Sequence, residues 1–489
     1  MNDTPAAPAA PQTPSDRTRW EAFAVCAAVA ALTIMDLSKI NVGLPTIEHS
    51  LSGGPTELQL IVAGYALAFG LALVPAGRLG DIHSRKAMFV IGLSSFILAS
   101  LLCAVAPTIE VLVIGRILQG VAAGIQMPQV LGLIQQLFQG RERGQAFGLF
   151  GAIIGLSTAI GPTLGGLLIA LGGEADGWRL LFWMNLPLGI LALIFAVRLL
   201  PSHQQHERRH TELDLVGILL LGAGVFGLML PFVLTTGGPD DDPKRWFWLV
   251  LFVIAAVAFV IWERRYLARG KSPVVDFGLF RLGSYRNGIL IATAYFAATP
   301  AIFLLTTLYV QQGLGLAAVF AGMISIPFAL VSAWTSWIGG RHVHRLGRKL
   351  VLFGLALVFV GFVLALPVAA YSPPELVPWL LAVCMGVAGA GGGFVISPNQ
   401  TLTLTDVPVV QGGVAGSVAQ VGQRAGTAIG VAVASSTYFA TLYRENGLHD
   451  RIEVYSDAFR NGLLVALGLV LVALVFGLLD LRQPQAARR

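Results

Sequence analysis

The chain has 489 residues, of which 55% are hydrophobic and only 12% are charged. Soluble proteins carry about 25% charged residues, so the composition excludes a soluble protein, and recurring apolar runs of about 20 residues predict a polytopic helical membrane protein. The net charge of +6 could indicate a nucleic-acid partner, but the basic residues lie in short loops between the apolar runs, where they set the orientation in the membrane. We therefore expect no nucleic-acid partner. The three cysteines lie inside those runs, which argues against disulfides and metal binding.

Fourteen membrane-spanning helices are predicted along the chain. Their approximate bounds, in chain order, are residues 21–48, 57–78, 86–106, 109–137, 144–171, 178–200, 213–235, 246–267, 285–312, 319–340, 349–371, 377–403, 411–442 and 459–481. Residues 1–19 are polar, rich in proline and alanine, and lack the apolar core of a signal peptide. We interpret them as a disordered cytoplasmic tail, and residues 482–489 as a second cytoplasmic tail.

The lysines and arginines set the orientation of these helices. With both termini cytoplasmic, most of the 32 fall on the cytoplasmic side. The exceptions are Arg179, Lys244, Arg245, Arg444, Arg451 and Arg460 outside, and Lys39, Arg116 and Arg424 within spans. The outer loops carry acids instead, as at residues 240–242, so the pattern follows the positive-inside rule. We expect a multi-pass protein of the cytoplasmic (inner) membrane.

A ten-residue pattern occurs twice. The loop at residues 77–86, after the second span, and the loop at residues 340–349, after the tenth, share the frame Gly-Arg-(six residues)-Arg-Lys. Such duplication is typical of transporters built from repeated halves. We therefore predict an N-terminal six-helix half (20–200), a cytoplasmic linker (201–212), two inserted helices (213–268), a second cytoplasmic linker (269–284) and a C-terminal six-helix half (285–481). Three histidines in the first linker (His203, His206 and His210) fit a solvated linker better than a metal site.

The first copy of this loop contains an acid among the basic residues. Asp81 could pair with basic residues across the interface between the halves and so latch one conformation, with Gly77, Arg85 and Lys86 completing the latch. Topology signalling alone is the alternative, but it gives no reason for Asp81. The second copy has His344 at the matching place, so only the first copy can make the acidic contact.

Charged residues inside two spans are the main candidates for function. Arg116, in the fourth span, must face a partner or a water-filled cavity, unless it reaches the outer surface from near its helix end. Asp36 lies near the middle of the first span, with Lys39 three residues later on the same helical face. An apolar setting favours the neutral acid and a nearby cation favours the carboxylate, and such opposed effects suit reversible proton binding. Lys39 could form a structural ion pair, titrate together with Asp36, or meet a carboxylate of the substrate.

Two further groups of residues fit a transport path. The fifth span carries Gly155, Gly161, Pro162, Gly165 and Gly166, which permit a kink and close helix packing, although general packing would use glycines too. In the twelfth span a glycine run before Pro398 predicts a broken helix that lines a cavity. Polar residues within spans are candidates either for the substrate cavity or for interhelical hydrogen bonds, namely Tyr65, Gln126, Gln311, Gln312, Asn399 and Arg424.

These patterns together resemble the fourteen-helix drug:proton antiporters of the major facilitator superfamily, over nearly the whole chain. The first loop matches the superfamily pattern Gly-x-Leu-x-Asp-Arg-x-Gly-Arg-Lys except at Ile82 and Ser84. The first span matches Asp-x-Thr-(two apolar)-Asn-Val-Ala-Leu-Pro at Asp36, Asn41, Val42, Leu44 and Pro45, and departs from it at Lys39. The resemblance implies the major facilitator fold, a role for Arg116 in proton coupling, and export rather than import from the fifth-span motif.

We therefore expect an all-α membrane protein with two six-helix halves and two inserted helices. It would export amphipathic organic compounds, such as antibiotics or dyes, in exchange for protons by alternating access. The alternative is a proton-coupled exporter of an anionic or zwitterionic metabolite anchored by Lys39. The expected partners are a small-molecule substrate, protons and membrane lipid. The chain lacks the Gly-x-x-x-x-Gly-Lys-Ser/Thr loop and any catalytic constellation, so we expect no nucleotide, no cofactor and no enzymatic activity.

Overall fold

The structure is a computed structural model that describes residues 16–52, 54–201, 214–235, 241–316, 318–445 and 450–482. These residues form helices and no strand, and 14 of the helical segments are long and apolar enough to cross a membrane. The predicted all-α fold with fourteen spans is confirmed. The histidines of the first linker, most of both predicted tails and Asp240 lie outside the described residues.

The first six spans form one group of helices. They are α1 (Asp16–Leu51), α2 (Pro55–Ile82), α3 (Arg85–Ala104), α4 (Ile109–Leu137), α5 (Gly140–Asp176), and a sixth span made of η1 (Gly177–Arg179), α6 (Leu180–Trp183) and α7 (Asn185–Leu199). Ser84 begins α3 as its N-cap, because its hydroxyl accepts a hydrogen bond from the Ala87 N–H at 3.2 Å. The main pairs in this group are α2 with α4, α3 with α4, and α1 with α5.

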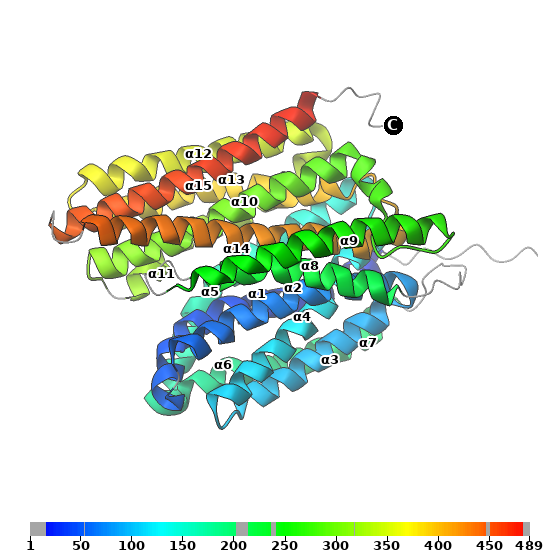
Figure 1. The fold of residues 1–489 in the computed structure, drawn as a ribbon, viewed down its shortest axis with the longest axis horizontal. Coiled ribbons are helices and arrows are strands. Elements are labelled where there is room, and N and C mark those ends of the chain that lie inside the picture. Colours follow the sequence, from blue (N-terminus) through cyan, green and yellow to red (C-terminus); the bar gives the residue numbers. More distant parts are fainter. Residues whose placement is uncertain are drawn as a thin grey trace, which may run out of the picture.

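The last six spans form a second group, shown from green to red in Figure 1. They are α10 (Gly283–Leu308) with the π-helical turn η4 (Tyr309–Gly313), α11 (Ala318–Leu346), α12 (Arg348–Tyr371), α13 (Val377–Thr403), α14 (Gly412–Glu445) and α15 (Arg451–Arg482). Short 3-10 turns, η3 (Phe277–Arg281) and η5 (Val409–Gln411), precede α10 and α14. We call α1–α7 the N-terminal half and α10–α15 the C-terminal half.

The two inserted helices form a pair beside the seam between the halves. They are α8 (Leu215–Val233) and α9 (Trp248–Ala268), and the turn η2 (Pro243–Phe247) precedes α9. In Figure 1 this green pair lies across the boundary between the two halves, and α8 contacts both α2 and α14.

The two halves meet most closely at the face that holds the start of α1 and the end of α15, which we call the termini face. A Cβ on Gly148 of α5 would lie 2.9 Å from the Gly340 Cα of α11, and one on Gly77 of α2 would lie 2.7 Å from the Gly413 carbonyl oxygen. Farther from that face the packing loosens, because a Cβ on Gly155 would be 3.8 Å from its nearest neighbour, the Ala329 carbonyl oxygen. The halves therefore pack most tightly at the termini face, and the contact between α5 and α11 loosens toward the middle of α5.

One expectation about a helix was wrong. The twelfth span is not broken, because α13 runs continuously from Val377 to Thr403 with Pro398 inside it. Its glycines serve close packing instead. A Cβ on Gly389 would lie 2.3 Å from the Phe328 carbonyl oxygen of α11, and one on Gly391 would lie 2.3 Å from the Gly354 carbonyl oxygen of α12.

Candidate functional site

A charged cluster lies fully inside the N-terminal half, about midway along α1. Both carboxylate oxygens of Asp36 are engaged: Oδ2 accepts from Arg116 at 2.6 Å, and Oδ1 accepts from the Asn185 amide at 2.7 Å. The Lys39 Nζ lies 3.3 Å from Asp36 Oδ1 and donates to the side-chain oxygen of Asn185 at 2.7 Å. Asp36 and Arg116 are completely buried and Lys39 is 1% exposed, so the apolar interior strengthens these interactions.

Arg116 extends this cluster into a wider polar network. It donates to the side-chain oxygen of Gln119 at 2.7 Å and to the Ile61 backbone carbonyl at 3.1 Å. The side-chain amide of Gln119 donates in turn to the Ser100 hydroxyl at 2.8 Å. One guanidinium nitrogen, Nη2, is buried without a hydrogen-bond partner. The guanidinium thus turns inward to Asp36, which removes the alternative that Arg116 reaches the outer surface.

Two aromatic rings connect the charged cluster to the C-terminal half. The Arg116 guanidinium carbon lies 4.2 Å from the centre of the Tyr65 ring, which is stacked on Phe69 with centroids 6.3 Å apart and planes within 8°. The Arg424 guanidinium carbon lies 4.7 Å from the centre of the Phe69 ring. We call Arg116, Tyr65, Phe69 and Arg424 the cation–aromatic column; it crosses from α4 through α2 to α14.

The glycine motif of α5 packs against the helix that carries the cluster. A Cβ on Gly161 would lie 3.3 Å from the Met35 carbonyl oxygen and closer still to the Ser38 hydroxyl, and one on Gly165 would lie 3.1 Å from the Lys39 carbonyl oxygen. Pro162 lies inside α5 between them. The predicted close packing is therefore present at Gly161 and Gly165, whereas Gly155 and Gly166 have neighbours only at 3.8 and 3.9 Å.

Asp81 does contact the other half, but through a different partner from the one expected. Its carboxylate accepts from the backbone N–H groups of Gly413 at 3.1 Å and Val414 at 2.9 Å, in the first turn of α14. Its basic partner, Arg85, belongs to the same half, lies 2.7 Å away, and donates in turn to the Val409 carbonyl at 2.5 Å. The expectation of a basic partner across the interface was wrong, because a helix N-terminus supplies the positive end of a dipole there.

The second copy of the loop pairs with an acid outside the loop, which the sequence pattern did not reveal. Arg348, the counterpart of Arg85, forms an ion pair with Asp480 at the end of α15 and also donates to Asn399. Asn399 further donates to the Gly288 carbonyl at 2.9 Å. Asn399 is therefore part of a buried network within the C-terminal half and does not line a cavity.

The remaining cavity candidates divide by position. Gln126 is buried in the N-terminal half, where its amide donates to the Thr33 hydroxyl at 2.6 Å. Gln311 and Gln312 lie in the π-helical turn η4, and the exposed Gln312 offers its backbone carbonyl to Arg451 at 2.7 Å. Of the six candidates, only Tyr65 and Arg424 meet in the cation–aromatic column.

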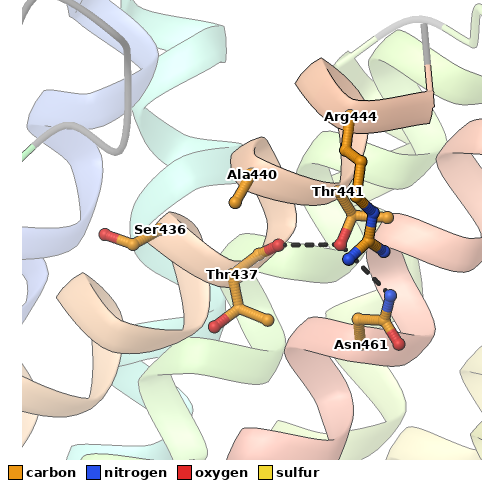
Figure 2. A pocket seen from close by; sticks show the side chains of 6 residues that line it. All are labelled: Ser436, Thr437, Ala440, Thr441, Arg444 and Asn461. Atoms are coloured by element: carbon orange, nitrogen blue, oxygen red, sulfur yellow. Dashed lines mark hydrogen bonds between the residues drawn. The ribbon is translucent and has the colours of Figure 1, made fainter.

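A hollow on the molecule lies away from this column. It is formed by α14 and α15 and is lined by Ser436, Thr437, Ala440, Thr441, Arg444 and Asn461 (Figure 2). Thr441 donates to the Thr437 carbonyl at 2.9 Å and accepts from Asn461 at 3.1 Å, so its hydroxyl is already satisfied. At 1.5 Å per residue, Thr441 is about 26 Å along α14 from Arg424, so the hollow is not part of the column.

Residues 26–431 match the family model described as Major Facilitator Superfamily. The chain belongs to this superfamily. It is 34% identical over 427 residues to a probable actinorhodin transporter of Streptomyces coelicolor, a match that covers 87% of this chain and 73% of that protein. It is 32% identical to the puromycin resistance protein pur8 of Streptomyces alboniger, over 88% of this chain and 84% of that one.

Solved structures of this superfamily agree with the fold. The crystal structure of the human organic anion transporter MFSD10 (TETRAN) aligns with a TM-score of 0.64 and 14% identity, over 92% of this chain and 99% of that one. At that identity the likeness concerns the fold alone. Membership of the superfamily and the transporter relatives make this chain a multi-pass membrane transporter of small molecules.

Sequence reasoning missed four members of the buried networks, namely Asn185, Gln119, Ser100 and Asp480. Asn185 had a signal, because an amide within an otherwise apolar span needs a partner there. Among the described residues, no group of three or more His, Cys, Asp or Glu side chains is placed to hold a metal ion.

Proposed function

We propose that this transporter exports amphipathic organic compounds across the cytoplasmic membrane in exchange for protons, through alternate opening of its two halves. The observation that carries the proposal is the completely buried Asp36, held by Arg116, Lys39 and Asn185 next to the interface helix α5. Ionisable groups at this depth are costly, and in transporters they mark proton and substrate paths. The relatives named as an antibiotic transporter and a resistance protein support export as the direction.

The charges of the cluster favour the pair Asp36–Lys39 as the proton site. One carboxylate and two cations give a net positive charge when all three groups are ionised. A proton added to Asp36 would leave two uncompensated positive charges, whereas a proton lost from Lys39 would leave none. In a low-dielectric interior the second change costs less, so the exchanged proton belongs to the coupled pair rather than to Asp36 alone.

The conformation fits one stage of such a cycle. With the termini face assigned to the cytoplasm, the contacts of α5 with α11 and of α2 with α14 close the cytoplasmic side. The bonds from Asp81 to the start of α14 then act as the latch of this outward-facing state. In the inward-facing state these contacts would separate as the predicted halves, residues 20–200 and 285–481, rock about the central site.

The cation–aromatic column provides a route between proton and substrate. Loss of a proton from the pair changes the field acting on Arg116, whose guanidinium lies against Tyr65 and through it against Phe69. Phe69 faces the other half, where a substrate between the halves would bind. Substrate binding and proton release would therefore influence each other without direct contact between the substrate and Asp36.

The alternative in which Lys39 anchors an anionic metabolite has little support. Its ammonium group is 1% exposed and already interacts with Asp36 and Asn185. A substrate carboxylate would have to displace both partners to reach it.

Proton release on ligand addition tests the proposal. Ethidium or fluorescein is added to purified full-length protein in weak buffer, and the pH change is recorded for the wild type, Asp36→Asn and Lys39→Gln. The exposed acid Glu110, on the same helix as Arg116, gives the control Glu110→Gln. We expect release by the wild type and the control and none by the other two variants. Release by Lys39→Gln at the wild-type level would place the proton on Asp36 alone, and undiminished release by Asp36→Asn would refute the assignment.

A further inference from the structure

We propose that Arg424 is the anchor for an anionic group of the substrate, and that the stacked rings of Phe69 and Tyr65 support its apolar, aromatic part. The inference rests on the proposed export function and specifies its substrate class: flat organic anions such as aromatic carboxylates, sulfonates or phenolates.

Arg424 is a membrane-embedded cation that no acid among the described residues pairs with. Among the described residues, none forms a hydrogen bond or an ion pair with its guanidinium, and its one close contact of note is the face of Phe69. Its nitrogens are not among the buried polar atoms that lack a partner, so they reach accessible space. An arginine within a span must face a partner or water, and this one keeps its donors available.

The position of Arg424 on its helix directs it toward the other half. The flanking glycines Gly422 and Gly426 pack on Thr293 of α10, where an added Cβ would lie 2.6 Å from the hydroxyl and 2.2 Å from the carbonyl oxygen. A residue two positions from each of these glycines lies about 200° around the helix, away from α10. Its contact with Phe69 of α2 confirms that direction.

The depth of the site is that of a central transport site. Phe69 lies midway along α2 (Pro55–Ile82), and Arg424 lies about 18 Å, at 1.5 Å per residue, from the start of α14. The two residues belong to opposite halves, so any rocking of the halves alters the distance between them. A ligand held by both would therefore sense, and bias, the conformation of the transporter.

The local charge selects for anions. Two buried acids of the N-terminal half are already paired with cations: Asp36 with Arg116 and Lys39, and Asp81 with Arg85 at the termini face. The charge of Arg424 is thus uncompensated, and a planar guanidinium matches carboxylate and sulfonate geometry. The buried Tyr65 hydroxyl has no hydrogen-bond partner and offers a further donor.

The rings define the rest of the ligand. Phe69 and Tyr65 are nearly parallel and lie beside the cation, and both rings are buried in this conformation, so a ligand would stack on them where the two halves part next to Arg424. A ligand with an anionic group and a fused or conjugated ring system satisfies both features at once, through charge-assisted hydrogen bonds and ring stacking. A flat organic cation would share the stacking surface but be repelled by Arg424.

Equilibrium binding of two matched dyes tests this. Fluorescein, a flat anion, and ethidium, a flat cation, are titrated with purified full-length protein in detergent, and fluorescence anisotropy gives each Kd. The variants are Arg424→Gln, Arg424→Lys and, as a control with the same loss of charge, Arg264→Gln at an exposed position of α9. Thermal unfolding shows whether each variant is folded.

We expect the wild type to bind fluorescein more tightly than ethidium. Arg424→Gln should weaken fluorescein binding at least tenfold and leave ethidium binding unchanged or tighter. Arg424→Lys should lose less affinity for fluorescein than Arg424→Gln. The control should bind both dyes with a Kd within twofold of the wild-type value. No preference for fluorescein in the wild type, a change below twofold in Arg424→Gln, or equal losses of both dyes would overturn the inference. The titration uses no proton gradient, so its outcome is independent of whether Asp36→Asn abolishes proton release.

Discussion

The latch at Asp81 makes a prediction about conformation that can be measured directly. In the structure its carboxylate accepts two backbone N–H groups of α14, from the other half, and one ion pair from Arg85 of its own half. Asp81→Asn removes the charge but keeps the size and one acceptor oxygen. The closed termini face should therefore lose stability relative to the separated one.

The magnitude follows from the kind of bond that is lost. Hydrogen bonds to a charged group contribute about 1.5–3 kcal/mol each, against about 1 kcal/mol for neutral ones. Converting two charge-assisted bonds to one neutral bond and one unmade bond costs roughly 2 kcal/mol or more across the interface. A change of about 2 kcal/mol shifts the equilibrium between the two states about 30-fold.

Distances between two spin labels, one on each half, test this shift. The native cysteines at 26, 103 and 384 are buried, so spin labels attach selectively at H83C, directly after α2, and R345C of α11, both exposed at the termini face. The matched control is Asp480→Asn, which removes a buried acid whose arginine partner lies in the same half. Asp81→Asn should add a longer distance that Asp480→Asn does not add. Equal distance distributions for wild type and Asp81→Asn would refute the latch.

Two further predictions concern α5 and Asn185. Gly148→Ala should impair transport and lengthen the same spin distance, because its methyl group would clash with backbone atoms of Gly340. Gly155→Ala should transport like the wild type, because its methyl group would make only an ordinary van der Waals contact at 3.8 Å. Similar activity of both variants in dye efflux would contradict the packing argument. Asn185→Leu should abolish ligand-induced proton release while the protein stays folded, because it removes the amide that bridges Asp36 and Lys39; unchanged release at every pH tested would show that the bridge is dispensable.

The fold followed from sequence because membrane helices are specified by composition. Apolar length and the distribution of basic residues predicted all fourteen spans, and α4 begins and ends at the predicted residues, 109 and 137. The failure at α13 has a physical cause. A glycine run before a proline is compatible both with a broken helix and with close packing, and only the neighbouring backbones of α11 and α12 decide between them.

The site was predictable in part. Asp36, Lys39 and Arg116 stood out because charges in a span are costly, and the structure brings all three together. Partners were harder to foresee. Asp81 meets backbone N–H groups, which every sequence offers, and Asp480 lies at the end of the last helix, far along the chain from Arg348. Interactions of that kind depend on tertiary packing and leave no local pattern.

The inserted pair α8–α9 packs on both halves through apolar contacts and is tied to the N-terminal half by a hydrogen bond as well. Toward the N-terminal half it is tied by a hydrogen bond, from the Gln59 amide to the Val233 carbonyl at 2.7 Å, and Met229 packs on Gly70 of α2, next to Phe69. Toward the C-terminal half, Val414, on the first turn of α14, shares an apolar cluster with Phe259 of α9, and Val74 of α2 belongs to the same cluster. Apolar contacts are non-directional, so we expect α14 to slide past the pair at a small cost in free energy. The hydrogen bond to Gln59 would keep the pair on α2. In the proposed cycle the pair would therefore stay on α2 beside Phe69 while the halves rock.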